Sequence, residues 1–155
     1  MYQLDGKVAL VTGAGGEHGL GRAIARRLAQ EGAHVVINDI TAQRLDGAEW
    51  AGLPDLAREI EALGRQALPI VADVANAEQV DAMVQRAVQH FGQVDILVNN
   101  AGALAGRDRV PVVELAEAEW DRIQNVNVKG TFLCCRAVAR AMIERGKGGK
   151  IINIS

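Results

Sequence analysis

Short apolar runs alternate with longer amphipathic segments along almost the whole chain of 155 residues. The short runs are rich in Val, Ile, Leu and Ala, and they predict strands at 7–12, 33–39, 67–73, 94–98 and 150–154. The longer segments predict helices at 19–31, 54–64, 76–91 and 117–145. This alternation is typical of βαβ units, in which helices cover both faces of a parallel sheet. The sequence therefore predicts an α/β fold with a doubly wound parallel sheet.

Three local signals refine this prediction. Pro69 lies inside the third expected strand, and proline has no N–H group to donate to a neighbouring strand, so this strand should lie at a sheet edge. The order 3-2-1-4-5, with strands numbered along the chain, places it there. Asn76 and Gln79 predict a capping box at the start of a helix that Gly92 ends. Residues 41–53 have no clear period and predict a surface excursion.

Composition and charge exclude several classes of protein. The formal net charge is −2 and acidic and basic residues are interleaved, which disfavours binding to nucleic acid or to an anionic membrane. No apolar stretch approaches the ~18 residues of a membrane span, and the N-terminus lacks the pattern of a secretory signal. Cys134 and Cys135 are neighbours and suit neither a disulfide framework nor a metal site. We expect a cytoplasmic protein with reduced thiols and no bound metal.

A glycine-rich turn, "TGAGGEHGLG", joins the first expected strand to the first expected helix. Glycines at such a turn let the backbone approach a pyrophosphate, and the amides at the start of the helix stabilise its charge. The alternative is a turn that needs glycine only for its conformation. The candidate dinucleotide-binding residues here are Thr12, Gly13, Gly15, Gly16, Gly19, Leu20 and Gly21.

Asp39 ends the second expected strand. A carboxylate at this place can accept hydrogen bonds from the ribose hydroxyls of adenosine and would repel a 2′-phosphate, which predicts NAD over NADP. The alternative is an ordinary polar residue at a strand end. Arg44 lies nearby in the sequence and could accommodate a phosphate, which leaves NADP as the second candidate.

Four motifs, taken together and in order, resemble the short-chain dehydrogenase/reductase family. They are "TGAGGEHGLG", "ADV" at 72–74, "NNAG" at 99–102 and "WDRIQNVNVKGTF" at 120–132. The resemblance implies a Rossmann-type sheet that binds a nicotinamide dinucleotide. It also implies that Asp73 and Val74 border the adenine, that Asn100, Ala101 and Gly102 line the cofactor cleft, and that Asn127 takes part in a proton relay. The structural alternatives are that Asp73 caps a turn, that Gly102 makes one, and that Asn127 is a surface residue.

The sequence departs from the family in two places. Glu17 and His18 lengthen the glycine loop, and we expect a solvated tip in which Glu17 pairs with His18 or Arg22; the alternative is that His18 reaches the phosphate or substrate. The family's Tyr-x-x-x-Lys motif is absent, because the only tyrosine is Tyr2. Ser155 falls one residue before the position of the family's catalytic serine. We therefore expect residues 1–155 to be one dinucleotide-binding domain that lacks the last strands of the family fold; the alternative is a true short form.

The favoured function is an NAD-dependent oxidoreductase that transfers hydride between a nicotinamide and a small secondary alcohol or ketone. The resemblance further implies a homo-oligomer that packs through the helix at 117–145. Two rivals remain open from the residues alone. One is a dinucleotide-binding sensor without activity, which the missing tyrosine allows, and the other is a Rossmann-type methyltransferase.

Overall fold

The computed structural model describes residues 3–42, 50–103, 106 and 108–155. The strands are β1 (Val8–Val11), β2 (His34–Asp39), β3 (Ala67–Val71), β4 (Ile96–Asn99) and β5 (Lys150–Asn153). The helices are α1 (Leu20–Gln30), α2 (Leu53–Ala62), α3 (Ala77–Phe91), α4 (Glu117–Gln124) and α5 (Thr131–Glu144), with short turns η1 (Val112–Glu114) and η2 (Asn125–Gly130). The five predicted strands and the first three predicted helices are thus present, with ends shifted by a few residues, whereas the expected helix at 117–145 is divided into α4, η2 and α5.

The five strands form one parallel sheet in the order β3-β2-β1-β4-β5. This confirms the predicted fold class and strand order. β3 lies at one edge, and Pro69 pairs in register with Ile37 of β2. Because β3 has a neighbour on one side only, the missing N–H of Pro69 is tolerated.

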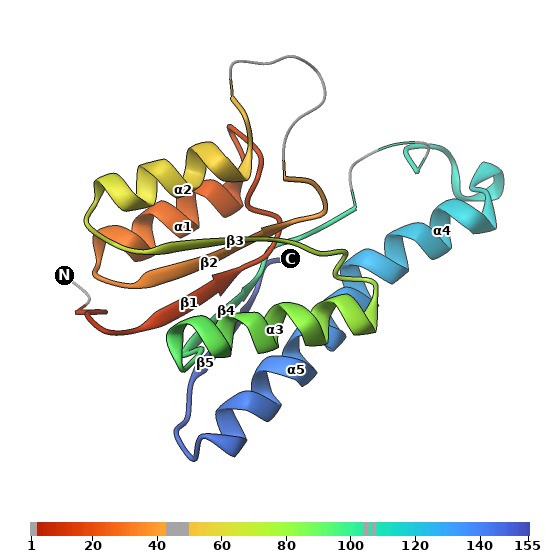
Figure 1. Cartoon of the computed structure of the whole chain (residues 1–155). Helices are drawn as coiled ribbons and strands as arrows, with labels where there is room; N and C mark the ends of the chain where they lie inside the picture. Colours follow the sequence, from red (N-terminus) through yellow and green to blue (C-terminus); the bar gives the residue numbers. More distant parts are fainter. Residues whose placement is uncertain (1–2, 43–49, 104–105, 107) are drawn as a thin grey trace.

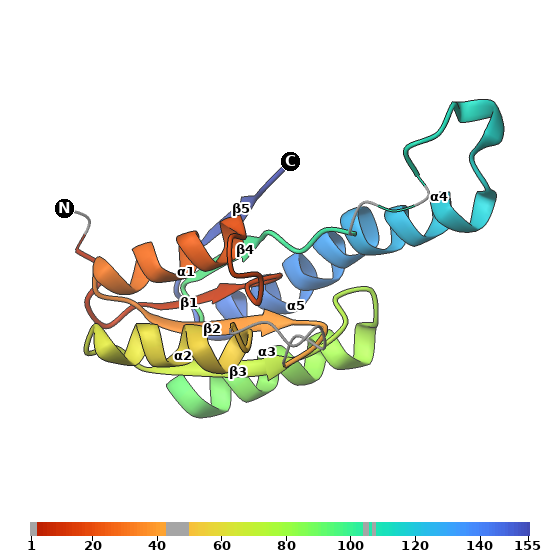
Figure 2. The same ribbon diagram turned by 90° about the horizontal axis from the view of Figure 1, so that it is seen from above.

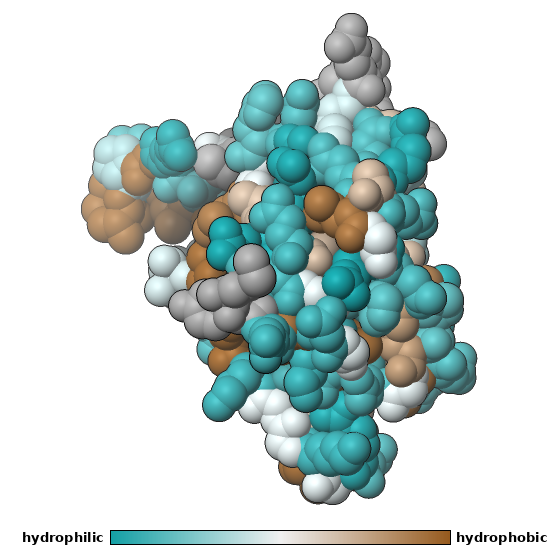
Figure 3. Space-filling model, turned by 90° about the vertical axis from the view of Figure 1, so that its left-hand side faces the viewer, coloured by the Kyte–Doolittle hydropathy of each residue, from teal (hydrophilic) through white to brown (hydrophobic). Residues whose placement is uncertain are grey.

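Helices cover both faces of the sheet, with α1 and α2 on one face and α3 and α5 on the other (Figures 1 and 2). Alternate residues of β1 supply the two cores. Leu10 packs on the side of α3 and α5, and Val11 packs on the side of α1 and α2. Burying one such side chain stabilises the fold by about 1.5–3 kcal/mol. Figure 3 shows that hydrophilic residues predominate on one outer face of the molecule.

The start of α3 confirms the predicted cap and corrects the predicted box. The Gln79 N–H donates to Asn76 Oδ1 at 3.1 Å, as expected. The Gln79 side chain does not return to the Asn76 N–H, because that group already donates to the Asp73 carbonyl at 3.0 Å. Gln79 Oε1 instead accepts the Asp73 N–H at 2.8 Å. Gly92 ends the helix in the left-handed conformation, with φ 76°.

The expected helix at 117–145 is interrupted by a π-helical turn, η2, between α4 and α5. Gly130 ends this turn against Val74: a Cβ on Gly130 would lie 2.8 Å from Val74 Cγ2. The Thr131 hydroxyl donates to the Asn127 carbonyl at 2.7 Å and so satisfies a carbonyl within the turn. Helical periodicity does not reveal such a turn, and π turns occur often at functional sites.

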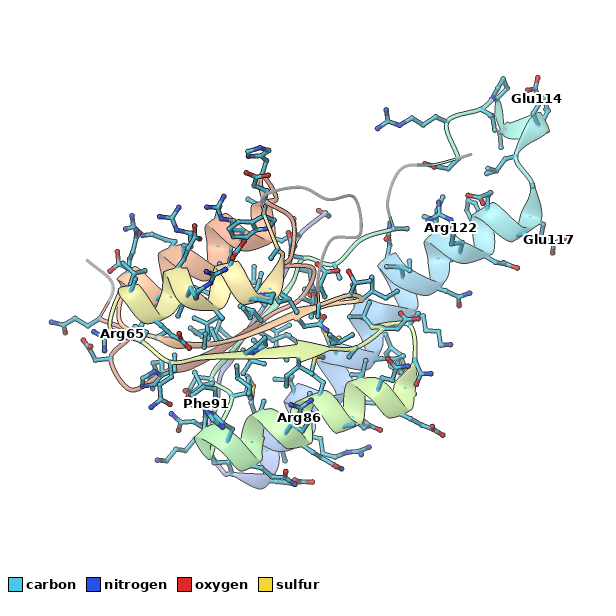
Figure 4. The ribbon with its side chains drawn as sticks, turned by 45° about the horizontal axis from the view of Figure 1, so that its top comes forward. Arg65, Arg86, Phe91, Glu114, Glu117 and Arg122 are labelled. Carbon is cyan, nitrogen blue, oxygen red and sulfur yellow. The ribbon has the colours of Figure 1, made fainter. Side chains whose placement is uncertain are left out.

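η1 and α4 form an arm that projects beyond the carboxyl edge of the sheet (Figures 1 and 2). Figure 4 shows Glu114 and Glu117 at the outer end of this arm, with Arg122 closer to the body. Among the helices that the structure describes, none combines the length and the apolar composition needed to cross a membrane.

Candidate functional site

Thr12 and Asn100 connect the carboxyl ends of the two central strands, β1 and β4. The buried Thr12 Oγ1 accepts the N–H groups of Asn100 and Ala101, at 3.1 and 3.0 Å. In return, Asn100 Nδ2 donates to the carbonyls of Thr12 and Gly13, both at 2.9 Å. These bonds fix the start of the glycine loop against the "NNAG" segment. The two motifs that the sequence predicted to share a cleft therefore lie side by side.

Two glycines of the loop are required by close approach of the backbone. A Cβ on Gly13 would lie 2.7 Å from Ala101 Cα, and Gly13 has a φ of +65°. A Cβ on Gly21 would lie 2.4 Å from the Gly13 carbonyl oxygen and 2.6 Å from Asn100 Nδ2. Gly21 therefore lets the first turn of α1 press against the loop and the end of β4.

The start of α1 offers free backbone amides. Gly19 is its N-cap, and no side chain of the described residues caps this end. The first turn of α1 contains no acidic residue. Unpaired N–H groups and the positive end of the helix dipole together favour a bound anion such as a pyrophosphate. Leu20, the first residue of α1, is exposed beside them.

Asp39 lies beside the glycine loop and is held by two backbone amides. Its Oδ2 accepts the Gly15 N–H at 2.8 Å, and its Oδ1 accepts the Ile40 N–H at 2.8 Å. The geometry therefore fixes the predicted ribose-binding carboxylate against the predicted pyrophosphate loop. Each carboxylate oxygen keeps lone pairs for a further donor. Arg44, the residue that could accommodate a 2′-phosphate, lies outside the described residues.

Asn38 is a positioning residue that the sequence did not reveal. Its side chain is buried, and Nδ2 donates to the carbonyls of Ile70 and Ala72 at 3.1 and 3.0 Å. The backbone carbonyl of Asn38 accepts the Ala14 N–H at 2.8 Å. Asn38 thus connects β2 to the end of β3 and to the glycine loop. A polar residue within the apolar run "VVIND" is the signal that could have indicated it.

Asp73 and Val74 follow β3 at the same edge of the sheet. Asp73 Oδ1 accepts the Ala75 N–H at 2.8 Å, so the turn-capping alternative is present in the structure, while the contact with adenine stays a prediction. Val74 is buried in the core beside α3 and α5 and contacts Gly130. The "ADV" motif therefore packs directly on the π-helical turn.

Asn127 lies in η2 and contacts the loop after β4. Its Oδ1 accepts the Ala103 N–H at 2.8 Å and lies 3.6 Å from the position of a Cβ on Gly102. The structure thus brings Asn127 to the "NNAG" segment across 24 residues of sequence. Its own backbone carbonyl accepts the Thr131 hydroxyl.

His18 is exposed at the tip of the glycine loop, and Glu17 beside it is partly exposed. His18 Nε2 lies 3.9 Å from Glu17 Oε2, and the His18 side chain is 89% exposed. Arg22 contacts Glu17 differently from the prediction: it donates to the backbone carbonyl of Glu17, while its guanidinium pairs with the Glu59 carboxylate. The hydrogen bond to Glu59 raises the pKa of Arg22 above its ordinary value.

The remaining candidates are the two cysteines of α5 and Ser155 after β5. Cys134 is buried, and desolvation raises the pKa of its thiol to about 12. Cys135 Sγ accepts from Asn99 Nδ2 at 3.2 Å, and the same amide donates to Asn153 Oδ1 at 2.9 Å. Ser155 is exposed beyond β5. Within the described residues, no group of three or more His, Cys, Asp or Glu side chains could hold a metal ion.

Comparison with known proteins gives matches over nearly the whole chain. A family model described as short chain dehydrogenase matches residues 7–155. The chain is 44% identical, over 98% of its length, to the (2S)-[(R)-hydroxy(phenyl)methyl]succinyl-CoA dehydrogenase subunit BbsD of Thauera aromatica, of which it covers 56%.

Solved structures match in fold as well as in sequence. A putative short-chain dehydrogenase/reductase from Burkholderia xenovorans has a TM-score of 0.85 and 39% identity, over 100% of this chain and 56% of that one. An NAD+-bound xylitol dehydrogenase has a TM-score of 0.84 and 35% identity, over 97% of this chain and 53% of that one. The chain therefore spans a little over half the length of the proteins it matches.

Proposed function

The chain belongs to the short-chain dehydrogenase family, and from this membership we propose that it binds NAD at the carboxyl edge of its sheet, as part of an oxidoreductase. The proposed reaction is hydride transfer between the nicotinamide and a small secondary alcohol or ketone. When bound, the nicotinamide supplies or accepts the hydride, and the protein supplies orientation and electrostatics.

One observation carries the proposal: the Asp39 carboxylate is hydrogen bonded to the Gly15 amide, next to the uncapped start of α1. A carboxylate suits the two ribose hydroxyls of adenosine, and a helix start with free amides suits the adjoining pyrophosphate. The two groups therefore match the two neighbouring parts of one dinucleotide. The NAD+-bound xylitol dehydrogenase of similar fold supports the same cofactor.

For the other site residues we propose the roles that membership of the family implies. Thr12 and Asn100 hold the glycine loop against β4, with Asn100 near the nicotinamide-side ribose. Asp73 and Val74 border the adenine at the end of β3. Asn127 positions the Ala103 amide at the nicotinamide end of the cleft and belongs to the proton relay.

The alcohol proton needs a general acid or base, and we assign none of the described residues to that role. Cys134 is buried with a raised pKa, and Lys129 is exposed on η2. Asn127 is the one member of the family's catalytic set that we assign in this chain, and Ser155 lies one residue before the position of the catalytic serine.

Two alternatives have less support. A Rossmann-type methyltransferase shares the glycine turn and the acidic residue after β2, but the matches are to dehydrogenases and reductases. A dinucleotide sensor without activity would share every binding contact described above. Turnover of NAD with a panel of secondary alcohols separates the enzyme from the sensor.

NADH fluorescence titration tests the binding proposal. We expect saturable binding of NADH, weaker binding of NADPH, and loss of this preference in Asp39→Ser. A folded protein that binds neither dinucleotide contradicts the proposal. Equal affinity of the unaltered protein for NADH and NADPH contradicts the role of Asp39.

We further propose a homo-oligomer that packs through α5. Phe132 and Ile143 are 57% and 77% exposed on this helix, and the described chain leaves them facing solvent. Exposed apolar side chains on one helix favour contact with another protein surface. Sedimentation analysis of the unaltered protein and of Ile143→Lys tests this, because the substitution should lower the oligomeric mass.

A further inference from the structure

We propose that Trp50 is a positioning residue for the pyrophosphate-binding loop, acting through the Gly15 carbonyl and through Arg22. The inference rests on the proposed function, because it assumes that the glycine loop receives a pyrophosphate. Trp50 is not part of any motif that led to the family. It lies between β2 and α2, three residues before Leu53 begins α2.

The Trp50 indole is 8% exposed and packs in the core beside α1 and α2. Its Nε1–H donates to the Gly15 carbonyl at 2.8 Å, in a buried hydrogen bond. The Gly15 N–H donates to Asp39 Oδ2 at 2.8 Å. Both backbone groups of Gly15 are therefore fixed, one by the indole and the other by the proposed ribose-binding carboxylate.

Arg22 extends this arrangement to the tip of the loop. Its guanidinium carbon lies 4.3 Å from the centroid of the Trp50 ring, within the range of a cation–π contact. Two hydrogen bonds to the Glu59 carboxylate, at 3.1 and 2.5 Å, hold the guanidinium on α2. From there, Arg22 NH1 donates to the Glu17 carbonyl at 2.5 Å. Trp50 thus binds the carbonyl of Gly15 and Arg22 binds that of Glu17, the residues on either side of Gly16.

These contacts matter because a carbonyl oxygen repels the oxygens of a phosphate. A carbonyl engaged by a donor is directed toward that donor, which leaves the loop amides for the anion. The loop is also lengthened by Glu17 and His18, so more chain must be ordered when a ligand binds. A loop that is already fixed in the free protein loses less conformational entropy on binding, and this raises affinity.

The test replaces Trp50 by Phe, which keeps an aromatic ring for Arg22 but removes the indole N–H. We expect the affinity for ADP and for NADH to fall about tenfold, the size of effect that loss of one buried hydrogen bond produces. Adenosine lacks the pyrophosphate, so its affinity should fall less than that of ADP. Trp120→Phe is the matched control: Trp120 is 54% exposed on α4, and its replacement should leave all three affinities unchanged.

The outcomes separate this inference from the proposed function. If the unaltered protein binds neither NADH nor ADP, the proposed function fails. If it binds them and Trp50→Phe binds them equally well, the proposed function stands and the role of Trp50 is wrong. Equal weakening of adenosine and ADP also overturns that role, because it indicates a general loss of structure.

A fluorescence measurement tests the role of Trp50 without replacing it, and it is used if Trp50→Phe does not fold. The chain has two tryptophans, so Trp50 is the only one left in Trp120→Phe. We expect its emission to change when ADP saturates the site, because the pyrophosphate would bring negative charge to the loop whose carbonyl the indole binds, and to change little with adenosine. Emission that stays constant while calorimetry shows ADP bound would overturn the inference.

Discussion

At the scale of single residues, the glycine loop is specified by contact distances. In Gly21→Ala, the new methyl group would collide with the Gly13 carbonyl and the Asn100 side chain. Overpacking of this kind destabilises a protein by about 1–3 kcal/mol. Gly16→Ala is the control in the same loop, because its nearest new contact is an ordinary 3.7 Å. Urea unfolding should show a clear loss of stability for Gly21→Ala and a small change for Gly16→Ala; equal losses would contradict the packing argument.

Cys134 predicts a pH dependence of stability. In the folded protein its thiol stays protonated up to about 12, whereas an unfolded chain ionises it near its ordinary value of 9.0. Above pH 9 the unfolded state therefore binds fewer protons, and stability falls as pH rises, by about 1.4 kcal/mol per pH unit from this residue. This loss of stability with rising pH ends near the folded pKa of about 12.

Urea unfolding between pH 8 and 10.5 measures this contribution. Cys134→Ala should show a shallower loss of stability with pH than the unaltered protein. The same slope in Cys134→Ala as in the unaltered protein would show that other groups cause the pH dependence.

At the scale of elements, the cap of α3 carries a prediction of its own. Asn76→Ala removes the acceptor for the Gln79 N–H, and loss of such a cap costs about 1 kcal/mol. Asn76→Asp is the control, because a carboxylate can accept the same hydrogen bond and also interacts favourably with the helix dipole. Urea unfolding should show that Asn76→Ala lowers the free energy of unfolding more than Asn76→Asp does. Equal destabilisation by Ala and Asp would mean that the side-chain acceptor contributes nothing.

Elements with a strong period were predictable, and features set by tertiary contact were not. The apolar positions of α3 and the runs of Val and Ile in β1 and β2 arise from burial, which is visible in the sequence. In the π turn, Gly130 packs against Val74, a residue far from it in the chain. The Trp50 contact with Gly15 crosses 35 residues in the same way. Such contacts leave no local pattern, and only the folded chain reveals them.

At the scale of the whole molecule, topology brings the candidate residues together. The sheet is parallel, so the ends of β1, β2, β3 and β4 meet at one edge, where ligands of such sheets bind. The resemblance to the family assigned the motifs to one cleft from the sequence. Their internal contacts, such as Asp39 with Gly15 or Asn127 with Ala103, required the structure.

Because the strand ends meet at one edge, the proposed binding of a dinucleotide should raise the stability of the whole fold. NADH would contact the ends of several strands, so a ligand that binds only the folded state raises its stability. At a concentration of about 100 times Kd the gain is about 2.7 kcal/mol, which for a chain of this size raises Tm by roughly 5–10 °C. Thermal unfolding followed by circular dichroism should show this rise with NADH and a smaller one with NADPH. In Asp39→Ser, NADH and NADPH should raise Tm by the same amount. The variant lacks the carboxylate that distinguishes the ribose of NADH from the phosphorylated ribose of NADPH.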